Sequence, residues 1–421
     1  MIGLAIVASA VLLQAGEKPV STGPYMGFGH FVGRAGDIDG DSVPDILIGD
    51  AGGSAESCYV FVVSGNGGRT LRAIPLPPLG AATPQVDGDL DLDGDGVPDI
   101  LVAARFIVER DVNRVLVISG RDGSMLHDIQ LKGLIWGLGS WARFVPDLDG
   151  DGLPEIGVLI LRPEAKSGTL EIFSGKTGNS IHTLAVRNVC GASSGAFCPV
   201  GDIDADGKYD IAVYADGGMN CRGTISIYAT TRQEGLWRLE SFGSGSGFGA
   251  LTTLGDLDAD GISELAVSFN NHVVVLGGKS GTPLAEFRPA GKTDSSPGFG
   301  WSVAGLGDID DDGMPDLAIA ETDRDMSEGE ILAKSVLDGR ELWRTRGSQE
   351  DDTWRLGYQL VALGDINGDG ITDLVAGTWG AKARANGLAQ VHSGKDGKLL
   401  SQFRRRGDEV VVTRRDSTIP K

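Results

Sequence analysis

Residues 308–320 read DIDDDGMPDLAIA, an acidic loop followed at once by a short apolar run. The loop pattern DxDxDGxxD, with small departures, occurs seven times along the 421 residues. The copies begin at Asp37, Asp91, Asp147, Asp202, Asp256, Asp308 and Asp365, at steps of 54, 56, 55, 54, 52 and 57 residues. Such even spacing over the whole chain predicts an array of small repeated units.

Each unit reads as four short strands. In the fifth copy, the segments FGALTTLGD, ELAVSF, HVVVLGG and PLAEF follow one another between residues 247 and 287. They are short, rich in β-branched and large apolar residues, and bounded by glycine or polar turns, which is typical of strands. The third strand recurs with a hairpin turn as VFVVSGNGG, VLVISGRDG, LEIFSGKTG and AQVHSGKDG.

Four-stranded units of this size cannot bury both of their faces alone, so they must pack face to face, and a ring closes the array. The sequence therefore predicts an all-β fold, a seven-bladed β-propeller of four-stranded antiparallel blades. We expect the propeller to span residues 16–407, followed by a C-terminal tail, 408–421. The end of the chain from Arg404 to Lys421 is polar and basic, and we expect it to be partly disordered. The expected blades are residues 27–77, 78–133, 134–187, 188–242, 243–291, 292–347 and 348–407.

Strand alternation places the loops. If the strands of a blade are A to D in chain order, the acidic A–B loops and the SGxxG turns between C and D lie on one face of the disc, here called the acidic face. The B–C loops and the D–A connections between blades then lie on the opposite face.

The acidic loop has the donor set of a calcium site. Carboxylates at positions 1, 3, 5 and 9 and the backbone carbonyl at position 7 offer hard oxygen ligands, and a glycine at position 6 lets the backbone reverse. An EF-hand is excluded because its position 12 is Glu, whereas here that position is apolar in every copy, for example Ile48 and Val102. Magnesium and zinc fit the pattern less well.

We expect up to seven calcium ions, and the candidate ligands are these. Position 1 is Asp37, Asp91, Asp147, Asp202, Asp256, Asp308 and Asp365; position 3 is Asp39, Asp93, Asp149, Asp204, Asp258, Asp310 and Asn367; position 5 is Asp41, Asp95, Asp151, Asp206, Asp260, Asp312 and Asp369. Position 7 is Val43, Val97, Leu153, Lys208, Ile262, Met314 and Ile371, and position 9 is Asp45, Asp99, Glu155, Asp210, Glu264, Asp316 and Asp373. The sixth copy matches the pattern best, and Ser42 at position 6 weakens the first. An ordinary Asp- and Gly-rich turn is the alternative interpretation.

The net charge of −21 belongs to these loops. They contain 27 of the 58 acidic residues, so the rest of the chain has 31 acids against 37 Lys and Arg. Seven bound divalent cations would bring the net charge from −21 to −7. Together with the lack of a basic patch interleaved with aromatics, this argues against a nucleic-acid partner.

Phe-Gly pairs precede several loops, for example Phe28-Gly29 and Phe299-Gly300, and a Gly such as Gly49 lies near the end of the second strand. With these features the chain resembles FG-GAP repeat proteins and, more distantly, the integrin alpha propeller. The resemblance covers residues 27–403. It implies a calcium-stabilised propeller, usually extracellular and often adhesive, with side-chain ligands at positions 1, 3, 5 and 9 of each loop. It also implies partner contacts on the opposite face. The second copy lacks the Phe-Gly pair.

Residues 1–15 resemble a secretory signal peptide, because a 12-residue apolar stretch precedes small residues. They lack a positive leading segment, so a misplaced start codon or a buried strand stays open. We expect a secreted, periplasmic or cell-surface protein, and no segment after residue 15 is apolar and long enough to span a membrane as a helix. Cys190 and Cys221 share the opposite face of the fourth blade and are the predicted disulfide, whereas Cys58 and Cys198 are expected as buried free thiols.

No catalytic residues are predicted. The sequence favours a noncatalytic propeller that recognises an extracellular protein or glycan, with a calcium-dependent polysaccharide lyase or other carbohydrate-active enzyme as the alternative. Trp136, Trp354 and Trp379 fall in loops of the opposite face, where an exposed Trp could contact a ligand. Packing between blades is the competing interpretation of these tryptophans. Arg406-Gly407-Asp408 spells an adhesive tripeptide, which is a weak match by itself.

Overall fold

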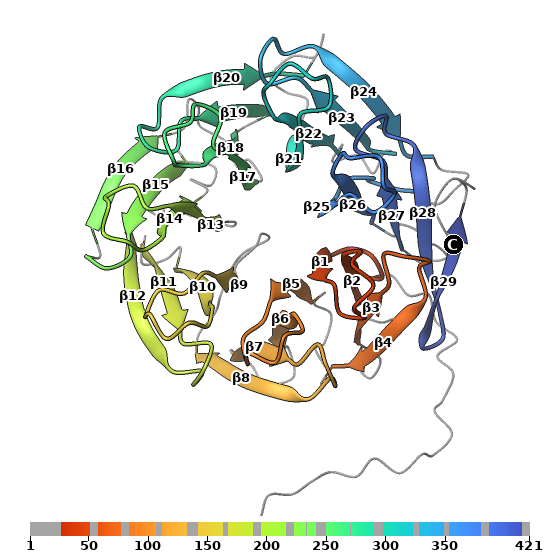
Figure 1. Ribbon diagram of the computed structural model, residues 1–421, viewed down its shortest axis with the longest axis horizontal. Coiled ribbons are helices and arrows are strands. Elements are labelled where there is room, and N and C mark those ends of the chain that lie inside the picture. The colour runs from red at the N-terminus through yellow and green to blue at the C-terminus, as the bar shows by residue number, and fades with distance from the viewer. Residues whose placement is uncertain are drawn as a thin grey trace, which may run out of the picture.

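The chain forms a ring of seven antiparallel sheets around a central channel in the computed structural model (Figure 1). The structure describes residues 27–50, 58–76, 84–106, 112–132, 142–162, 167–187, 195–215, 223–232, 234–240, 250–269, 271–289, 298–322, 328–348, 353–379 and 387–414. Six sheets have four strands and the seventh has five. This confirms the predicted all-β seven-bladed β-propeller, and within the described residues no helix is long and apolar enough to span a membrane.

Strands follow one another from the channel outward in each blade (Figure 1). The innermost are β1 (Val32–Gly36), β5 (Gln85–Leu90), β9 (Ala142–Val145), β13 (Gly195–Gly201), β17 (Leu251–Gly255), β21 (Phe299–Gly307) and β25 (Leu360–Gly364). The second are β2 (Asp45–Asp50), β6 (Asp99–Phe106), β10 (Glu155–Arg162), β14 (Asp210–Ala215), β18 (Glu264–Phe269), β22 (Asp316–Glu321) and β26 (Asp373–Gly377). The third are β3 (Tyr59–Val63), β7 (Val112–Ile118), β11 (Ser167–Phe173), β15 (Thr224–Ala229), β19 (His272–Leu276), β23 (Glu330–Lys334) and β27 (Leu388–His392). The fourth are β4 (Thr70–Pro75), β8 (Met125–Lys132), β12 (Ser180–Arg187), β16 (Glu234–Glu240), β20 (Pro283–Phe287), β24 (Glu341–Arg346) and β28 (Leu399–Arg406).

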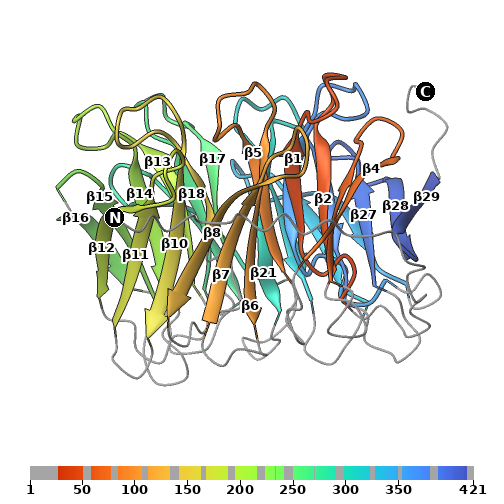
Figure 2. The same ribbon diagram turned by 90° about the horizontal axis from the view of Figure 1, so that it is seen from below.

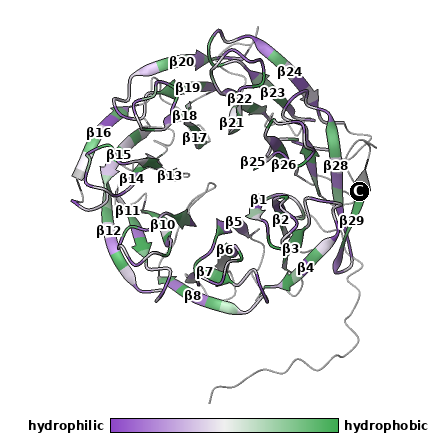
Figure 3. Ribbon diagram, in the orientation of Figure 1, coloured by the Kyte–Doolittle hydropathy of each residue, from purple (hydrophilic) through white to green (hydrophobic). Residues whose placement is uncertain are grey.

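The hydrophobic core is divided among the blade interfaces. Seven buried clusters are found among the described residues, one between each pair of neighbouring blades. Successive residues of a strand point to opposite faces, so in β2 Ile46 and Ile48 pack toward blade seven and Leu47 packs toward blade two. This two-sided burial explains why the second strands read as continuous apolar runs, whereas outer strands such as β8 and β24 mix hydrophilic and hydrophobic residues (Figure 3).

All seven acidic loops lie on one face of the disc, as the strand order predicts (Figure 2). In five blades the register of the two inner strands shifts just before the loop, where a glycine opposes the first residue of the second strand, as with Gly36 and Asp45. These glycines have positive φ angles, for example 71° at Gly36. A bulge of this kind bends the strand and turns the chain into the loop.

The last blade differs from the prediction. Residues 409–414 were expected in a tail, but β29 (Glu409–Arg414) pairs with β28 and gives blade seven a fifth strand. Arg406 and Glu409 oppose each other, so Gly407 and Asp408 form a two-residue hairpin turn, with φ of 70° at Gly407. The RGD tripeptide therefore occupies a hairpin tip. The available signal was the run of β-branched residues VVVT after Glu409, which the assumption of four strands per blade left unused.

A buried ion pair joins the first and last blades. Arg405 of β28 pairs through its guanidinium with the carboxylate of Asp50 at the end of β2, and the two side chains are 3% and 0% exposed. The same guanidinium lies 4.8 Å from the ring centroid of Tyr59. On the outside, the Val410 N–H of β29 donates to Thr70 Oγ of β4 at 3.1 Å. The C-terminal strands thus fasten the ring where it closes.

Candidate metal centres

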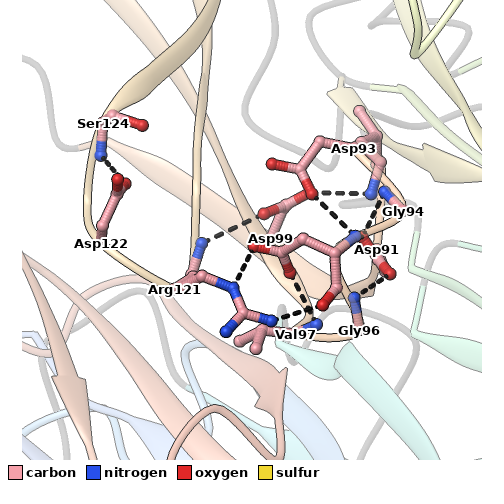
Figure 4. Close-up of polar contacts among 12 residues, drawn as sticks. Asp91, Asp93, Gly94, Gly96, Val97, Asp99, Arg121, Asp122 and Ser124 are labelled. Carbon is pink, nitrogen blue, oxygen red and sulfur yellow. Dashed lines mark hydrogen bonds and ion pairs between the residues drawn. The ribbon is translucent and has the colours of Figure 1, made fainter.

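Each acidic loop is held by its own carboxylates. In the second copy, Asp91 accepts hydrogen bonds from the backbone N–H groups of Gly94, Asp95 and Gly96 at 2.8, 3.1 and 2.8 Å (Figure 4). The position 5 carboxylate of Asp95 accepts from the N–H of Val97 at position 7, at 2.9 Å. The bond from position 7 to position 5 recurs in all copies. Asx-type bonds of this kind curl the loop and bring its carboxylates close to one another.

The position 9 carboxylate connects two loops. Asp99 Oδ2 accepts from the N–H of Leu92 in its own loop at 2.7 Å, and Oδ1 accepts from the N–H of Gly120 in the C–D turn at 3.1 Å. A Cβ atom on Gly120 would lie 1.9 Å from the carbonyl oxygen of Pro98, so glycine alone allows this approach. The position 9 side chains are all buried: Asp45, Asp99, Glu155, Asp210, Glu264, Asp316 and Asp373.

Burial raises the pKa of these closing carboxyl groups. The pKa of Asp45, Glu155 and Asp373 rises to about 7, and that of Asp99, Asp210 and Asp316 to about 6. The pKa of Glu264 is also raised. In each case desolvation is the main cause, opposed by backbone hydrogen bonds and reinforced by the other loop carboxylates. A carboxylate in such a place favours a cation beside it.

The loops bring together carboxylates that fit a metal ion. In the third copy Asp147, Asp149, Asp151 and Glu155 each offer an oxygen, and the four oxygens lie within 4.8 Å of one another. Comparable groups of three form in the first, second, fourth and fifth copies. At position 3, buried oxygens of Asp39, Asp204 and Asp310 have no hydrogen-bond partner. Carboxylate oxygens gathered this closely are hard ligands, which match the preference of calcium.

Basic residues of the C–D turn also reach the acidic loops, which sequence reasoning missed. Arg69 binds Asp39 at 2.9 Å and Arg232 binds Asp204 at 3.1 Å. Equivalent pairs link Arg121 to Asp95, Lys176 to Asp151 and Arg340 to Asp310. A Lys or Arg directly after SG was the available signal for Arg121 and Lys176 only. Because the basic side chains are more than half exposed, solvent screens these pairs and they contribute little to stability.

Two positions of every loop take a left-handed backbone, and the sequence pointed to one of them. Position 6 has φ of 86–88° in the six copies with glycine and 69° at Ser42, as expected. Position 4 is also left-handed throughout, and three copies place a residue with a side chain there: Ala205, Ala259 and Asp311, each with φ of 59°. The sixth copy, predicted to match best, therefore contains a strained residue of its own.

Replacing Ser42 by glycine is expected to stabilise the protein. A left-handed residue with a side chain costs about 1–2 kcal/mol, and the greater freedom of an unfolded glycine offsets part of the gain. We expect Ser42→Gly to raise the free energy of unfolding by about 0.5–1 kcal/mol, measured by denaturant titration at a fixed calcium concentration. Ser180→Gly is the control, because Ser180 is exposed in β12 without a positive φ. Equal or opposite effects at the two positions would contradict the interpretation.

The structure covers part of the remaining predictions. Cys190, Cys221 and Trp136 lie outside the described residues. Cys58 and Cys198 are buried, as expected, and Cys198 is a free thiol. Burial raises the pKa of the Cys198 thiol to about 12.

Trp354 and Trp379 lie on the opposite face as predicted, but Trp354 is only 8% exposed, which favours its packing role. Trp379 is half-buried and belongs to an aromatic cluster at the junction of blades six, seven and one. Its ring centroid lies 4.4 Å from that of His30 and 5.2 Å from that of Tyr358. His30 is 7% exposed, and desolvation lowers its pKa to about 3, so this histidine is neutral.

Fold and loops together define a β-propeller with repeated acidic A–B loops. The FG-GAP repeat model matches residues 357–392. The chain is 27% identical to integrin alpha-V of Gallus gallus over 199 residues, 42% of this chain and 19% of that protein. It is 33% identical to protein FAM234B of Gallus gallus over 165 residues, 37% of this chain and 25% of that protein. One stretch of the chain thus matches the FG-GAP repeat, and parts of the chain are similar to integrin alpha and FAM234B chains; the chain spans a quarter or less of these relatives.

Solved structures agree on the fold. The crystal structure of BBS1N in complex with ARL6DN superposes with a TM-score of 0.50 at 12% identity, covering 88% of this chain and 93% of that chain. At this identity the likeness shows the fold alone.

Proposed function

We propose that this protein is a noncatalytic, calcium-binding propeller that recognises an extracellular protein or glycan. The proposal rests chiefly on the position 3 carboxylates of Asp39, Asp204 and Asp310. Each has a buried oxygen, Oδ1, without a hydrogen-bond partner, although an arginine of the C–D turn pairs with the same carboxylate. Leaving such an oxygen without a partner costs free energy, which a bound cation would offset. Calcium would be held by positions 1, 3, 5 and 9 and the carbonyl at position 7, and it would supply charge neutralisation and rigidity.

Recognition is assigned to the opposite face. On the acidic face, the acidic loops and the C–D turns are hydrogen-bonded to each other. We therefore assign this face a structural role and not ligand binding. Likeness to integrin alpha chains supports a place at the cell surface or outside the cell. In this proposal calcium has a structural role and keeps the loops of the blades ordered. The ligand binds to the opposite face.

Calcium titration of one altered loop tests the metal sites. Calorimetry of metal-free protein should give a stoichiometry of up to seven ions, and Asp308→Asn/Asp312→Asn should remove one of them. Asp338→Asn, an exposed acid in the neighbouring C–D turn, is the control and should leave the stoichiometry unchanged. The assignment would be rejected if the titration gave no heat of calcium binding, or if the double variant bound as many ions as the unchanged protein.

Binding and turnover measurements separate recognition from enzymatic function. We expect calcium-loaded protein to bind one member of an array of extracellular proteins and glycans, without release of products. A polysaccharide lyase would generate unsaturated sugar ends, which absorb in the ultraviolet. If this absorbance appears with any polysaccharide, and only in the presence of calcium, the protein is a lyase and the proposed noncatalytic role is wrong.

A further inference from the structure

A cavity of about 280 Å³ lies in the central channel. Residues of all seven blades line it, most of them from the first half of the innermost strands, such as Val32, Gln85, Arg143 and Thr252, and Gln359 lies just before β25. The innermost strands run from the opposite face toward the acidic loops. The cavity therefore lies in the half of the channel nearer the opposite face, away from the metal loops.

Polar side chains in the cavity wall link neighbouring blades. Gln359 Oε1 accepts from the N–H of Val32 at 3.0 Å, and Ser302 Oγ accepts from the N–H of Leu360 at 3.0 Å. Arg143 donates one N–H to the carbonyl of Phe197 at 3.2 Å. These bonds hold the side chains at fixed places around the channel, because the strands of separate blades share no backbone ladder here.

The side chains of Gln359, Ser302 and Arg143 each have further donors besides the hydrogen bond that links the blades. Gln359 is bonded through its oxygen, so the two donors on Nε2 have no acceptor among the described residues. Ser302 accepts at Oγ and retains its O–H, and Arg143 retains further N–H donors. Asp87 supplies acceptors; its Oδ2 binds the N–H of Phe144 at 2.9 Å. The cavity thus presents both donors and acceptors at fixed positions.

Aromatic rings form the end of the cavity toward the opposite face. Trp301 and Tyr358 line it with ring centroids 5.2 Å apart, and Phe31 follows at 6.4 Å from Tyr358. The guanidinium of Arg355 lies 5.9 Å from the Trp301 ring centroid. Packing of Tyr358 against His30 and Trp379 keeps these rings in place. A ligand in this cavity would meet apolar ring faces on one side and polar groups on the other.

A sugar ring has the matching chemistry, since it carries C–H groups on its faces and hydroxyl groups around its edge, each both donor and acceptor. Liquid water takes about 30 Å³ per molecule, so the cavity has room for roughly nine waters, which suits one ring and not an oligosaccharide. The charged residues in its lining are one aspartate and one arginine, Asp87 and Arg143, which favours a ligand without net charge.

We propose that the channel cavity binds one neutral pyranose unit, either free or at the end of a glycan. Trp301 stacks on the ring, the buried Tyr358 holds the indole in place, and Gln359, Ser302, Arg143 and Asp87 bind the hydroxyl groups of the sugar. The inference rests on the recognition role proposed above and names the ligand class for it.

Saturation-transfer NMR with the full calcium-loaded chain provides the first test. The panel contains neutral hexoses, their methyl glycosides, short neutral oligosaccharides and two uronic acids. At least one neutral pyranose should receive saturation, and the oligosaccharides show whether a terminal unit is also accepted. Binding by none of the neutral sugars, or by uronic acids only, would overturn the proposal. Calcium titration of the same sample tests the proposed function separately.

Two substitutions locate the binding site by calorimetry with the best sugar. Trp301→Ala removes the stacking surface, and Gln359→Glu keeps the oxygen that accepts from Val32 while removing the Nε2 donors. Each is expected to weaken binding at least tenfold, with melting temperature as the check on folding. Gln130→Glu makes the same change at an exposed position of β8 and should leave affinity within twofold. Undiminished binding by both cavity variants would place the sugar elsewhere and reject the assignment.

Discussion

Removal of calcium is expected to lower the melting temperature of the protein by about 10 °C or more. A ligand that binds only the folded state stabilises it by about 2.7 kcal/mol per site at a concentration one hundred times its Kd. Three occupied loops would then contribute about 8 kcal/mol. For a propeller of this size, with an unfolding entropy of about 0.8 kcal/mol/K, that corresponds to about 10 °C. Further occupied loops would increase the effect.

The acidic loops explain why the effect should be large. Each brings several carboxylates to one centre, and like charges about 4 Å apart repel by roughly 4 kcal/mol at an effective dielectric of 20. The position 9 side chains fasten each loop to a C–D turn, as Asp99 does with Gly120. Loss of order in a loop would therefore reach the second and third strands of its blade.

The calcium effect should also depend on pH. In the metal-free protein burial raises the pKa of the position 9 carboxyl groups, to about 7 at Asp45. A raised folded-state pKa contributes stability below the unfolded value, near 4, and that contribution is lost as pH rises through 6 to 7. Calcium holds the ionised form, so the difference between calcium-loaded and metal-free melting temperatures should widen from pH 5 to pH 8.

Scanning calorimetry on protein stripped of metal by gel filtration, with and without added calcium, measures the effect without a chelator present. Magnesium at equal concentration is the control and should restore little of the lost stability, because it prefers a site that keeps several waters. Identical melting curves with and without calcium would reduce the loops to ordinary turns.

Much of the fold could be predicted from the sequence because the repeat encodes it locally. The acidic loop marks the A–B connection, and the apolar residues at position 12, such as Ile48 and Val102, are buried in strands as expected. The candidate ligands follow from the same local pattern, and in the first five copies the structure brings oxygens of three or four of the carboxylates within 4.8 Å of one another. Local sequence was sufficient to predict the four strands of each blade, because every blade repeats the same pattern.

What could not be predicted depends on contacts between blades. Asp50 and Arg405 are 355 residues apart, and nothing in either local sequence identifies the other as its partner. The channel cavity combines inner-strand residues of seven blades, so no motif encodes it. Trp354 illustrates the same limit, because its loop position was correct while its burial depends on how blade seven packs against its neighbours.

Arg405→Ala is expected to cost about 3–5 kcal/mol of unfolding free energy, because it removes the guanidinium that pairs with the buried carboxylate of Asp50. The aspartate is 0% exposed, and the guanidinium also packs over the rings of Tyr59 and Phe61. For a chain of this size the melting temperature should fall by about 4–6 °C. The substitution would weaken the interface between blades one and seven, where the ring closes.

Two further variants distinguish the buried pair from a general loss of positive charge. Arg406→Ala changes an exposed neighbour and should alter stability by no more than about 0.5 kcal/mol. Asp50→Leu/Arg405→Met replaces both charges with apolar groups, and it should recover most of the loss, since buried pairs are often replaced at little cost. If Arg405→Ala unfolds at the temperature of Arg406→Ala, the ion pair does not hold the ring closed. If the double variant stays as unstable as Arg405→Ala, packing of the guanidinium on Tyr59 and Phe61 is the larger contribution.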